Sequence, residues 1–362
     1  MTFYLPTRVY EETDCVTNHA SELGALGKRA LIVTGRHSAM ANGSLADVEE
    51  ALWKTGTSWE VFSDVEENPS VETILSARDV GVREQTDFVI GIGGGSPMDA
   101  AKAIALMIRH PDADASYLYD KSVPSDTVPV VCIPTTCGTG SEVTPVSVLT
   151  RHDIQAKGSI PHKIWPVLAL CDPKYLEYAS DTVLQNTACD ALAHLCESYV
   201  NTNATDYSRM CVDAGLKAWC ESLDVLRGER EPEITDYANM LRASTFAGMA
   251  IAHTGTSLPH GMSYSLTYDL GIAHGRACGQ YLMGYLAEAP VHDRSHLLHY
   301  AGFRKLDEMA NYFEDCVGYV NVPNDEREKI IQSISQNPAK LKNAPFPADE
   351  TVIRRIVSYW DL

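Results

Sequence analysis

Short apolar runs alternate with longer amphipathic stretches through the first half of the chain. The runs are rich in β-branched and other apolar residues, which predicts strands at Arg29–Thr34, Glu60–Ser63, Phe88–Gly93 and Pro129–Pro134. The stretches between them have helical periodicity, which predicts helices at Asp47–Thr55, Val71–Gly81 and Met98–Ile108. Strands that alternate with helices indicate a parallel sheet with helices on both faces.

The second half of the chain has a different pattern. After Asp172 the β-branched runs end, and long amphipathic segments predict helices at Thr187–Val200, Tyr207–Trp219, Asp236–Ala252 and Leu297–Tyr312. A chain of 362 residues also exceeds the ~250–300 residues at which a single core stops growing. We therefore expect two domains: an α/β domain over residues 1–176 and an all-helical domain over residues 177–362.

A glycine-rich turn, Gly91–Asp99, directly follows one of the predicted strands. Ser96 is a good N-cap, Pro97 suits the first helical position, and Asp99 stands where a capping-box acid would be. Glycines allow the backbone to approach a ligand closely, and a helix N-terminus offers free N–H groups to an anion. The turn therefore predicts a pyrophosphate site, with a ligand-free structural turn as the alternative. It is neither a GxGxxG fingerprint nor a P-loop.

A second turn, Pro134–Glu142, follows the next strand and is rich in hydroxyl side chains and glycine. Alone, such a turn is often an ordinary loop. The two turns, however, follow strands of the same predicted sheet, and α/β sheets bind ligands beyond the carboxyl ends of their strands. Together they favour a dinucleotide-binding site in the α/β domain.

Four residues of the helical half form a candidate metal site. Asp190 and His194 are four residues apart in a predicted helix, so their side chains share one face. His260 and His274 each precede a glycine. One carboxylate with three imidazoles suits Fe²⁺ or Zn²⁺ better than Mg²⁺ or Ca²⁺. The alternative is that the histidines are packed or surface residues without a metal.

A second histidine group has similar spacing. His292, His296 and His299 also share one face of a predicted helix. Their neighbours are charged, which is typical of the solvated face of an amphipathic helix. We do not expect a metal there.

Composition excludes several classes of protein. The formal net charge of −19 disfavours a nucleic-acid partner, because such partners are bound mainly through clustered lysine and arginine. No apolar run approaches the ~18 residues of a membrane span, and no signal peptide is visible at the N-terminus. The 10 cysteines are scattered without a CxxC pair, so we expect reduced thiols in a cytoplasmic protein.

Four segments together carry a resemblance to a known family. GGGSPMDAAKAIA, PTTCGTGSEVTPVSVLT, DALAHLCESY and LPHGMSYSLTYDLGIAHG resemble the signatures of the iron-containing (group III) alcohol dehydrogenases, in that family's order. The resemblance extends over almost the whole chain and is strongest to the butanol and 1,3-propanediol dehydrogenases. It implies a Rossmann-like nucleotide-binding domain followed by an all-helical domain, the fold shared with dehydroquinate synthase, and a homodimer or larger homo-oligomer.

The resemblance also implies roles for particular residues. The metal, Fe²⁺ with Zn²⁺ as the alternative, would be held by Asp190, His194, His260 and His274. Contacts to the nucleotide would come from Gly35, Asn68, Gly94, Gly95, Ser96, Asp99, Thr135, Thr136, Thr139, Thr144 and Lys157. Tyr264 departs from the family pattern, because many members have a further histidine there.

Coenzyme choice is expected to depend on the end of the first predicted strand. In many dinucleotide sites an acidic residue binds the ribose 2′-hydroxyl and repels a 2′-phosphate. Here the strand ends at Gly35, followed by Arg36 and, two residues later, Ser38. Gly35 leaves room, and Arg36 offers a charge-assisted hydrogen bond. This favours NADP over NAD, unless Arg36 is simply an exposed loop residue.

The predicted function is hydride transfer between NAD(P) and a small primary alcohol, diol or aldehyde. A divalent ion would act as the Lewis acid, and no catalytic residue is required beyond its ligands. Alternatives on the same fold are a glycerol dehydrogenase and a dehydroquinate synthase-like lyase. The lyase should have several basic residues near the metal, but only Arg276 lies near His260 and His274 in the sequence. An inactive binding module would predict a broken ligand set, whereas all four positions are filled.

Overall fold

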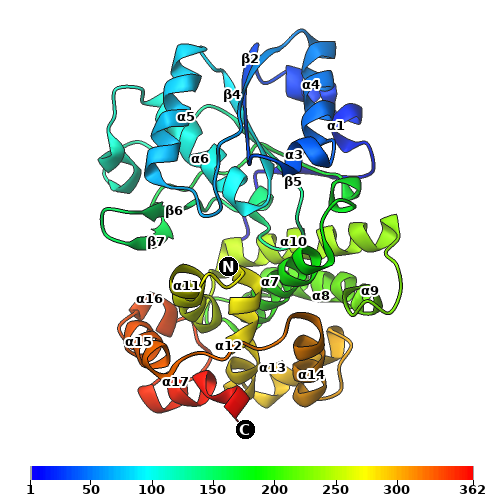
Figure 1. The fold of residues 1–362 in the computed structure, drawn as a ribbon, viewed down its shortest axis with the longest axis vertical. Helices are drawn as coiled ribbons and strands as arrows, with labels where there is room; N and C mark the ends of the chain where they lie inside the picture. Colours follow the sequence, from blue (N-terminus) through cyan, green and yellow to red (C-terminus); the bar gives the residue numbers. More distant parts are fainter. Residues whose placement is uncertain (1, 362) are drawn as a thin grey trace. The chain divides into compact units, whose positions relative to one another are not determined.

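A computed structural model describes residues 2–361. Contacts within the chain divide it into two compact units, shown in Figure 1. The α/β unit comprises Tyr4–Thr136 and Gly140–Ala179, and the helical unit comprises residues 180–361 with Cys137–Thr139 and residues 2–3. Three residues of the second glycine-rich turn thus pack with the helical unit, although their neighbours on both sides belong to the α/β unit.

The α/β unit is built on a six-stranded sheet in the order β1-β8-β5-β4-β2-β3, in which every neighbouring pair is parallel. The strands are β1 (Arg8–Glu11), β2 (Arg29–Thr34), β3 (Ser58–Phe62), β4 (Phe88–Gly93), β5 (Val130–Pro134) and β8 (Leu168–Cys171). A separate antiparallel hairpin pairs β6 (Val148–Arg151) with β7 (Ala156–Ser159). The predicted parallel α/β fold is confirmed, and the pattern missed only short strands of four residues.

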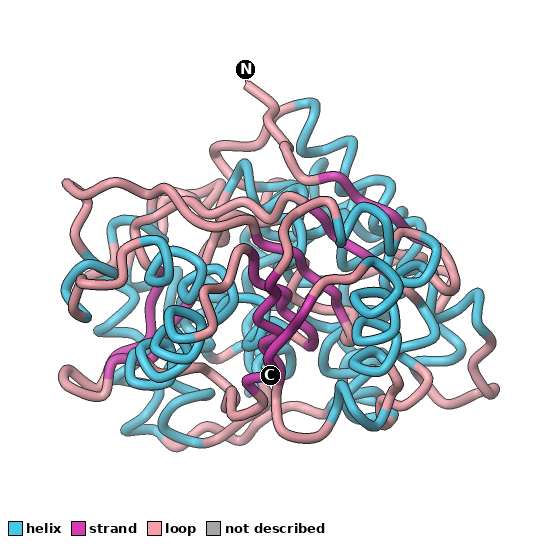
Figure 2. Tube along the Cα trace, turned by 90° about the horizontal axis from the view of Figure 1, so that it is seen from above, coloured by secondary structure: helices cyan, strands magenta, loops and turns pink. Residues whose placement is uncertain are grey.

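Helices cover both faces of this sheet, as Figure 1 shows for α5 and α6 on one side and α1 and α4 on the other. Alternate residues of a strand point to opposite faces. Leu31 and Val33 accordingly enter one apolar core, with residues of α5 and α6. Ala30 and Ile32 enter the other, with residues of α1, α2 and α4. Figure 2 shows the strands of the twisted sheet in magenta. The helices are α1 (Cys15–Asn18), α2 (Ala20–Gly24), α3 (Ser38–Ala41), α4 (Ser44–Thr55), α5 (Val71–Arg83) and α6 (Gly95–Arg109).

The helical unit is organised around α7 (Asp181–Val200), whose second half is buried throughout from Ala188 onward. Helices α8, α10 and α12 pack against it, and α11 packs against α12. The remaining bounds are α8 (Asp206–Cys220), α9 (Leu223–Leu226), α10 (Ile234–Thr254), α11 (Leu258–Leu270), α12 (His274–Glu288), α13 (Val291–Tyr300), α14 (Leu306–Val317), α15 (Asn324–Ser335), α16 (Pro338–Leu341) and α17 (Glu350–Val357).

One predicted helix is wrong. The segment Leu297–Tyr312 is not continuous, because α13 ends at Tyr300 and α14 begins at Leu306. Gly302, with φ +87°, lies in the connection, where its left-handed conformation interrupts the helix.

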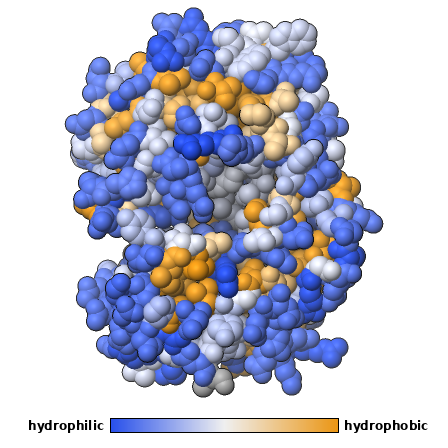
Figure 3. All heavy atoms as spheres, viewed as in Figure 1, coloured by the Kyte–Doolittle hydropathy of each residue, from blue (hydrophilic) through white to orange (hydrophobic). Residues whose placement is uncertain are grey.

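The face of the molecule seen in Figure 3 is mostly hydrophilic, with separate apolar patches. This agrees with a chain that carries 77 charged residues of both signs, 29 basic and 48 acidic. Among residues 2–361, no helix has the length and apolar character needed to cross a bilayer.

Candidate functional site

Three helices of the helical unit bring the predicted metal ligands together. Asp190 and His194 lie one turn apart on α7, His260 is the third residue of α11, and His274 is the first residue of α12. The glycine that follows His274 explains how α12 approaches α7 so closely. A Cβ added at Gly275 would lie 1.7 Å from the Asn186 carbonyl oxygen of α7. Only glycine therefore lets the start of α12 pack against the α7 backbone beside Asp190.

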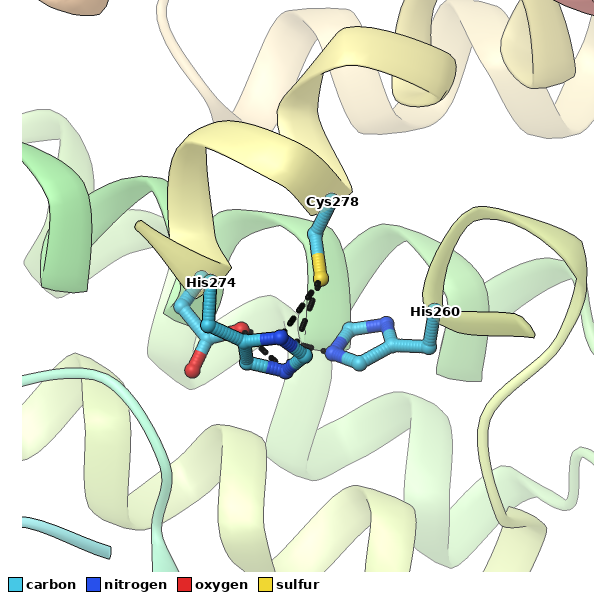
Figure 4. Close-up of side chains that lie close together, drawn as sticks. His260, His274 and Cys278 are labelled. Atoms are coloured by element: carbon cyan, nitrogen blue, oxygen red, sulfur yellow. Dashed lines mark hydrogen bonds and ion pairs between the residues drawn. The ribbon is translucent and has the colours of Figure 1, made fainter. Parts of the chain in front are cut away.

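The donor atoms converge on one point. Asp190 Oδ1 lies 3.3 Å from His260 Nε2 and 3.8 Å from His274 Nε2. The sulfur of Cys278 joins them, so that one ligand atom from each of these four residues lies within 4.8 Å of the others. Figure 4 shows the two imidazoles and the thiol pointing toward one another. Within the described chain, this is the group identified as able to hold a metal ion.

His260 is oriented by a residue that the sequence analysis missed. Its Nδ1 forms a short hydrogen bond with Glu197 Oε1, and the other oxygen of that carboxylate accepts from the Ser257 backbone N–H. Glu197 is fully buried, and it lies three residues after His194 and therefore on the same side of α7. Nε2, on the other side of the ring, faces the donor cluster, where a metal ion can replace its proton.

His194 is held differently from the other three predicted ligands. Its ring stacks on that of His260, with centroids 4.2 Å apart and an interplanar angle of 19°. Its Nδ1 lies 3.2 Å from the carbonyl oxygen of Gly138, so an Nδ1–H donated there would leave Nε2 free to bind an ion. The structure places His194 next to the cluster of four donors but not within it.

The charges of these groups are strongly coupled. Burial alone would raise the pKa of Asp190, but the imidazoles around it hold that pKa well below its usual range. Burial lowers the pKa of His194 to about 4, so its ring is neutral at neutral pH. Burial alone would also lower the pKa of His260. The Cys278 thiol and the carboxylates of Glu197 and Asp190 outweigh burial and raise it well above its usual value.

These residues fit a divalent transition-metal ion. Asp190 Oδ1 and His260 Nε2 are buried, and neither makes a hydrogen bond. Leaving two such atoms unsatisfied costs ~1–3 kcal/mol each, which an ion bound to both would remove. Negative groups that stabilise a proton on His260 would equally stabilise a cation in its place. Imidazole, carboxylate and thiolate donors suit Zn²⁺ and Fe²⁺ rather than Mg²⁺.

The helix that follows the first glycine-rich turn of the α/β unit begins at a different residue from the one predicted. Helix α6 begins at Gly95 with Gly94 as the N-cap, so Ser96 and Pro97 lie inside its first turn and no side chain caps it. The expected Ser96 N-cap is therefore wrong. Gly93, with φ +146°, lets the chain reverse directly after β4 and start the helix earlier than a serine cap would allow.

Predicted nucleotide residues of the two turns lie side by side. Thr135 N donates to the Gly93 carbonyl oxygen over 2.9 Å. A Cβ at Gly94 would lie 3.2 Å from Thr136 Oγ1. No side chain therefore caps the first N–H groups of α6, including that of Gly95. The hydroxyl of Thr136 lies beside this end of the helix. Such an arrangement can bind a phosphate.

A buried lysine holds the loop that follows the second turn. Lys102 is fully buried, and its ammonium donates to Ser141 O at 2.8 Å, to Val146 O at 2.8 Å and to Thr144 Oγ1 at 3.4 Å. The carboxylate of Asp99 accepts from Ser141 Oγ and from Val148 N. Asp99 and Thr144, which the resemblance assigned to nucleotide contact, are thus engaged in holding the loop in this structure.

Asn68 connects two further predicted nucleotide residues. Its backbone N–H donates to Ser96 Oγ over 3.0 Å, and its side-chain oxygen accepts from Lys157 Nζ. Asn68 has φ +58°, a left-handed conformation that asparagine tolerates better than most residues. The structure therefore groups Asn68, Ser96 and Lys157 beside the start of α6.

The remaining predicted nucleotide residues are Gly35 and Thr139. Gly35 directly follows β2, and a Cβ there would meet only the Val65 carbonyl oxygen, at 3.5 Å. Arg36 forms an exposed ion pair with Asp64. Thr139 is partly buried in the segment that packs with the helical unit.

The histidines of α13 do not form a metal cluster in the described structure. His296 Nε2 pairs with Asp213 Oδ1 at 2.7 Å, and its ring lies between those of Tyr199 and Tyr300. His296 is therefore a partly buried, packed residue rather than part of a solvated face.

Comparison with known proteins identifies the family. The sequence model of the iron-containing alcohol dehydrogenases matches residues 6–173, and that of the C-terminal part of the Fe-containing alcohol dehydrogenase family matches residues 185–336. The chain is 30% identical to a long-chain primary alcohol dehydrogenase of Thermoanaerobacter ethanolicus, over 90% of this chain and 88% of the relative. It is 30% identical to an NADPH-dependent butanol dehydrogenase of Clostridium saccharobutylicum, over 87% of this chain and 80% of the relative.

A solved structure agrees with these sequence relatives. An iron-containing alcohol dehydrogenase of Thermotoga maritima superposes with a TM-score of 0.91 at 36% identity, over 99% of this chain and 98% of that one. The resemblance seen in the four sequence segments is confirmed over nearly the whole length. The chain therefore belongs to the iron-containing alcohol dehydrogenase family and is a metal-dependent alcohol dehydrogenase.

Proposed function

We propose that the chain transfers a hydride between NAD(P) and a small primary alcohol, diol or aldehyde, at a divalent ion held by Asp190, His194, His260 and His274. The observation that carries this assignment of ligands is the pair of buried, unsatisfied atoms Asp190 Oδ1 and His260 Nε2, 3.3 Å apart. Fe²⁺ is the expected ion, because the chain belongs to the iron-containing family.

The ion, when bound, supplies Lewis-acid polarisation of the substrate oxygen and so eases loss of its proton. The protein's own residues prepare the position. Glu197 keeps the proton of His260 on Nδ1, so that Nε2 remains a donor. Burial of Asp190 and His260 excludes water from one side. His274 has 27% of its side chain exposed, which makes it the open side from which a substrate can approach.

Tyr264 stands in the position where many relatives have a further histidine. Its ring is parallel to that of His274, with centroids 6.3 Å apart, and it lies one turn after His260 on the same face of α11. The Lys340 ammonium lies 5.7 Å from the centroid of the same ring. Tyr264 therefore places an aromatic ring beside His274 in place of a further imidazole.

We also propose NADP as the preferred coenzyme. No acidic residue follows β2 at Gly35, where a Cβ would have room. The Arg36 guanidinium is 69% exposed, and its ion pair with Asp64 is of a kind worth ~0–1 kcal/mol, so a 2′-phosphate could displace the carboxylate. The NADPH dependence named for the Clostridium relative also supports this choice.

One experiment tests the whole proposal. The metal-free protein is loaded with Fe²⁺, Zn²⁺ or neither, and reduced coenzyme is followed by absorbance with a series of primary alcohols and both coenzymes. We expect turnover only with a metal, and a higher kcat/KM with NADP. Turnover unchanged in the presence of a strong chelator would refute the metal mechanism, and a higher kcat/KM with NAD would refute the coenzyme assignment alone.

A further inference from the structure

A cysteine that no sequence pattern predicted lies among the metal-site residues. Cys278 is one turn after His274 on α12, so the two side chains share a face of that helix. Its sulfur lies 3.7 Å from His274 Nε2 and is completely buried. In Figure 4 it approaches the two imidazoles from the side of α12.

We propose that Cys278 is a ligand of the same divalent ion, bound through its sulfur as a thiolate. This inference rests on the proposed function, because it concerns the ion placed there. Binding replaces the S–H bond with a sulfur–metal bond and releases the proton to solvent. No oxidant or reductant is involved.

The geometry supports a direct bond. Donors that share one ion at ~2.0–2.3 Å can be at most about 4.6 Å apart. The ligand atoms of Asp190, His260, His274 and Cys278 all lie within 4.8 Å of one another, so small rotations of the side chains would complete the site. His194, by contrast, is outside this group of four.

The surroundings of Cys278 differ from those of an ordinary buried thiol. Cys211, on α8, is also buried, but it belongs to none of the side-chain groups identified in the described chain as able to hold an ion. Cys278 is equally buried, and its sulfur lies 4.0 Å from Nδ1 and 3.7 Å from Nε2 of His274. Cys278 is thus a buried thiol that faces other metal donors.

A thiolate ligand has a consequence for metal choice. Soft sulfur donors favour Zn²⁺ over harder ions. A set of one carboxylate and several imidazoles discriminates less between Zn²⁺ and Fe²⁺. We therefore expect Cys278 to increase the affinity for Zn²⁺ more than that for Fe²⁺. Replacing Cys278 with serine should reduce the difference between the affinities for Zn²⁺ and Fe²⁺.

X-ray absorption at the zinc edge tests the inference on the full-length, Zn²⁺-loaded protein. We expect one sulfur at ~2.3 Å in addition to nitrogen and oxygen donors at ~2.0–2.2 Å. Cys278→Ser should lose the sulfur contribution and bind Zn²⁺ more than about tenfold more weakly in a chelator competition. Cys211→Ser, the matched control, should keep both the sulfur signal and the affinity.

The outcomes separate this inference from the proposed function. A wild-type spectrum with only nitrogen and oxygen donors, or a sulfur signal that persists in Cys278→Ser, would overturn the role of Cys278 while leaving an active metal enzyme in place. Failure of the wild-type protein to bind any metal would overturn both. Circular dichroism of the metal-free variants confirms folding, and Cys278→Ala replaces the serine variant if that one does not fold.

Discussion

The donor cluster of the helical unit and the glycine-rich turns of the α/β unit are built on opposite principles. The first is made of buried ionisable side chains, Asp190, Glu197 and His260, whose charges lie close to one another. The second is made of backbone and small side chains around Gly94 and Thr136, where the absence of a Cβ creates the space. Function should therefore depend on chemical identity in the cluster and on volume in the turns.

The largest effect is expected from removal of a donor. His274→Ala should lower kcat/KM by about three orders of magnitude, because metal assistance contributes several kcal/mol to the transition state. The fold should be retained, since 27% of this side chain is exposed and it begins a helix rather than filling a core. Metal content and thermal unfolding are the measurements. A metal-free variant with full turnover would remove His274 from the mechanism.

Gly275→Ala tests whether the stability of the protein depends on side-chain volume beside the donor cluster. The added Cβ would lie 1.7 Å from a backbone oxygen of α7, which cannot move without displacing that helix. Overpacking of this kind costs ~1–3 kcal/mol or more, and we expect a loss at the upper end of that range. Gly261→Ala is the matched control. Its new Cβ would meet the flexible ends of Ile334 and Lys340, so denaturant unfolding should show a smaller loss.

Glu197→Gln tests chemical identity at constant volume. The amide can no longer accept a charge-assisted bond from His260 Nδ1 in the same way, so His260 loses part of its basicity. We expect Zn²⁺ affinity to fall by about 10–100-fold, the usual effect of changing an outer-shell partner. Chelator competition measures it, and nucleotide affinity should not change. An unaltered Zn²⁺ affinity would mean that Glu197 only fills space.

Gly94→Val tests volume in the turns. A branched side chain would press on Thr136, whose Oγ1 already lies 3.2 Å from the position of a Cβ, and would occupy the space beside the free end of α6. Overpacking of ~1–3 kcal/mol corresponds to about 5- to 150-fold weaker binding of the dinucleotide. Titration calorimetry with the coenzyme measures it, while metal affinity serves as the internal control. Equal coenzyme affinity in the variant would make the turn purely structural.

The smallest effect is expected at the end of β2. Gly35→Asp introduces a carboxylate into a position with room for it, where it should repel a 2′-phosphate and accept a bond from a 2′-hydroxyl. The ratio of kcat/KM for NADP to that for NAD should fall severalfold, by roughly 1 kcal/mol of discrimination. Thermal stability should be unchanged. A constant ratio would show that this residue does not contact the ribose.

Periodicity predicted the central elements of the sheet well. The strands Arg29–Thr34 and Phe88–Gly93 have the predicted bounds, because continuous apolar runs are typical of strands buried on both faces. Short strands such as β1, with four residues, carry too little pattern to be recognised. The break between α13 and α14 depends on one glycine with positive φ, which a helical hydrophobic pattern does not reveal.

The sequence by itself determined what is local: the alternation that makes a parallel sheet, the glycines after β4, and the spacing that puts Asp190 and His194 on one face of α7. Only tertiary packing decided which distant residues meet them. Glu197 and His260 are 63 residues apart, and they pair because α7 and α11 both pack against α12. Cys278 enters the cluster because Gly275 permits close packing of two helices. Spacing along a chain fixes positions within one helix, whereas the approach of two helices depends on the shapes of both surfaces.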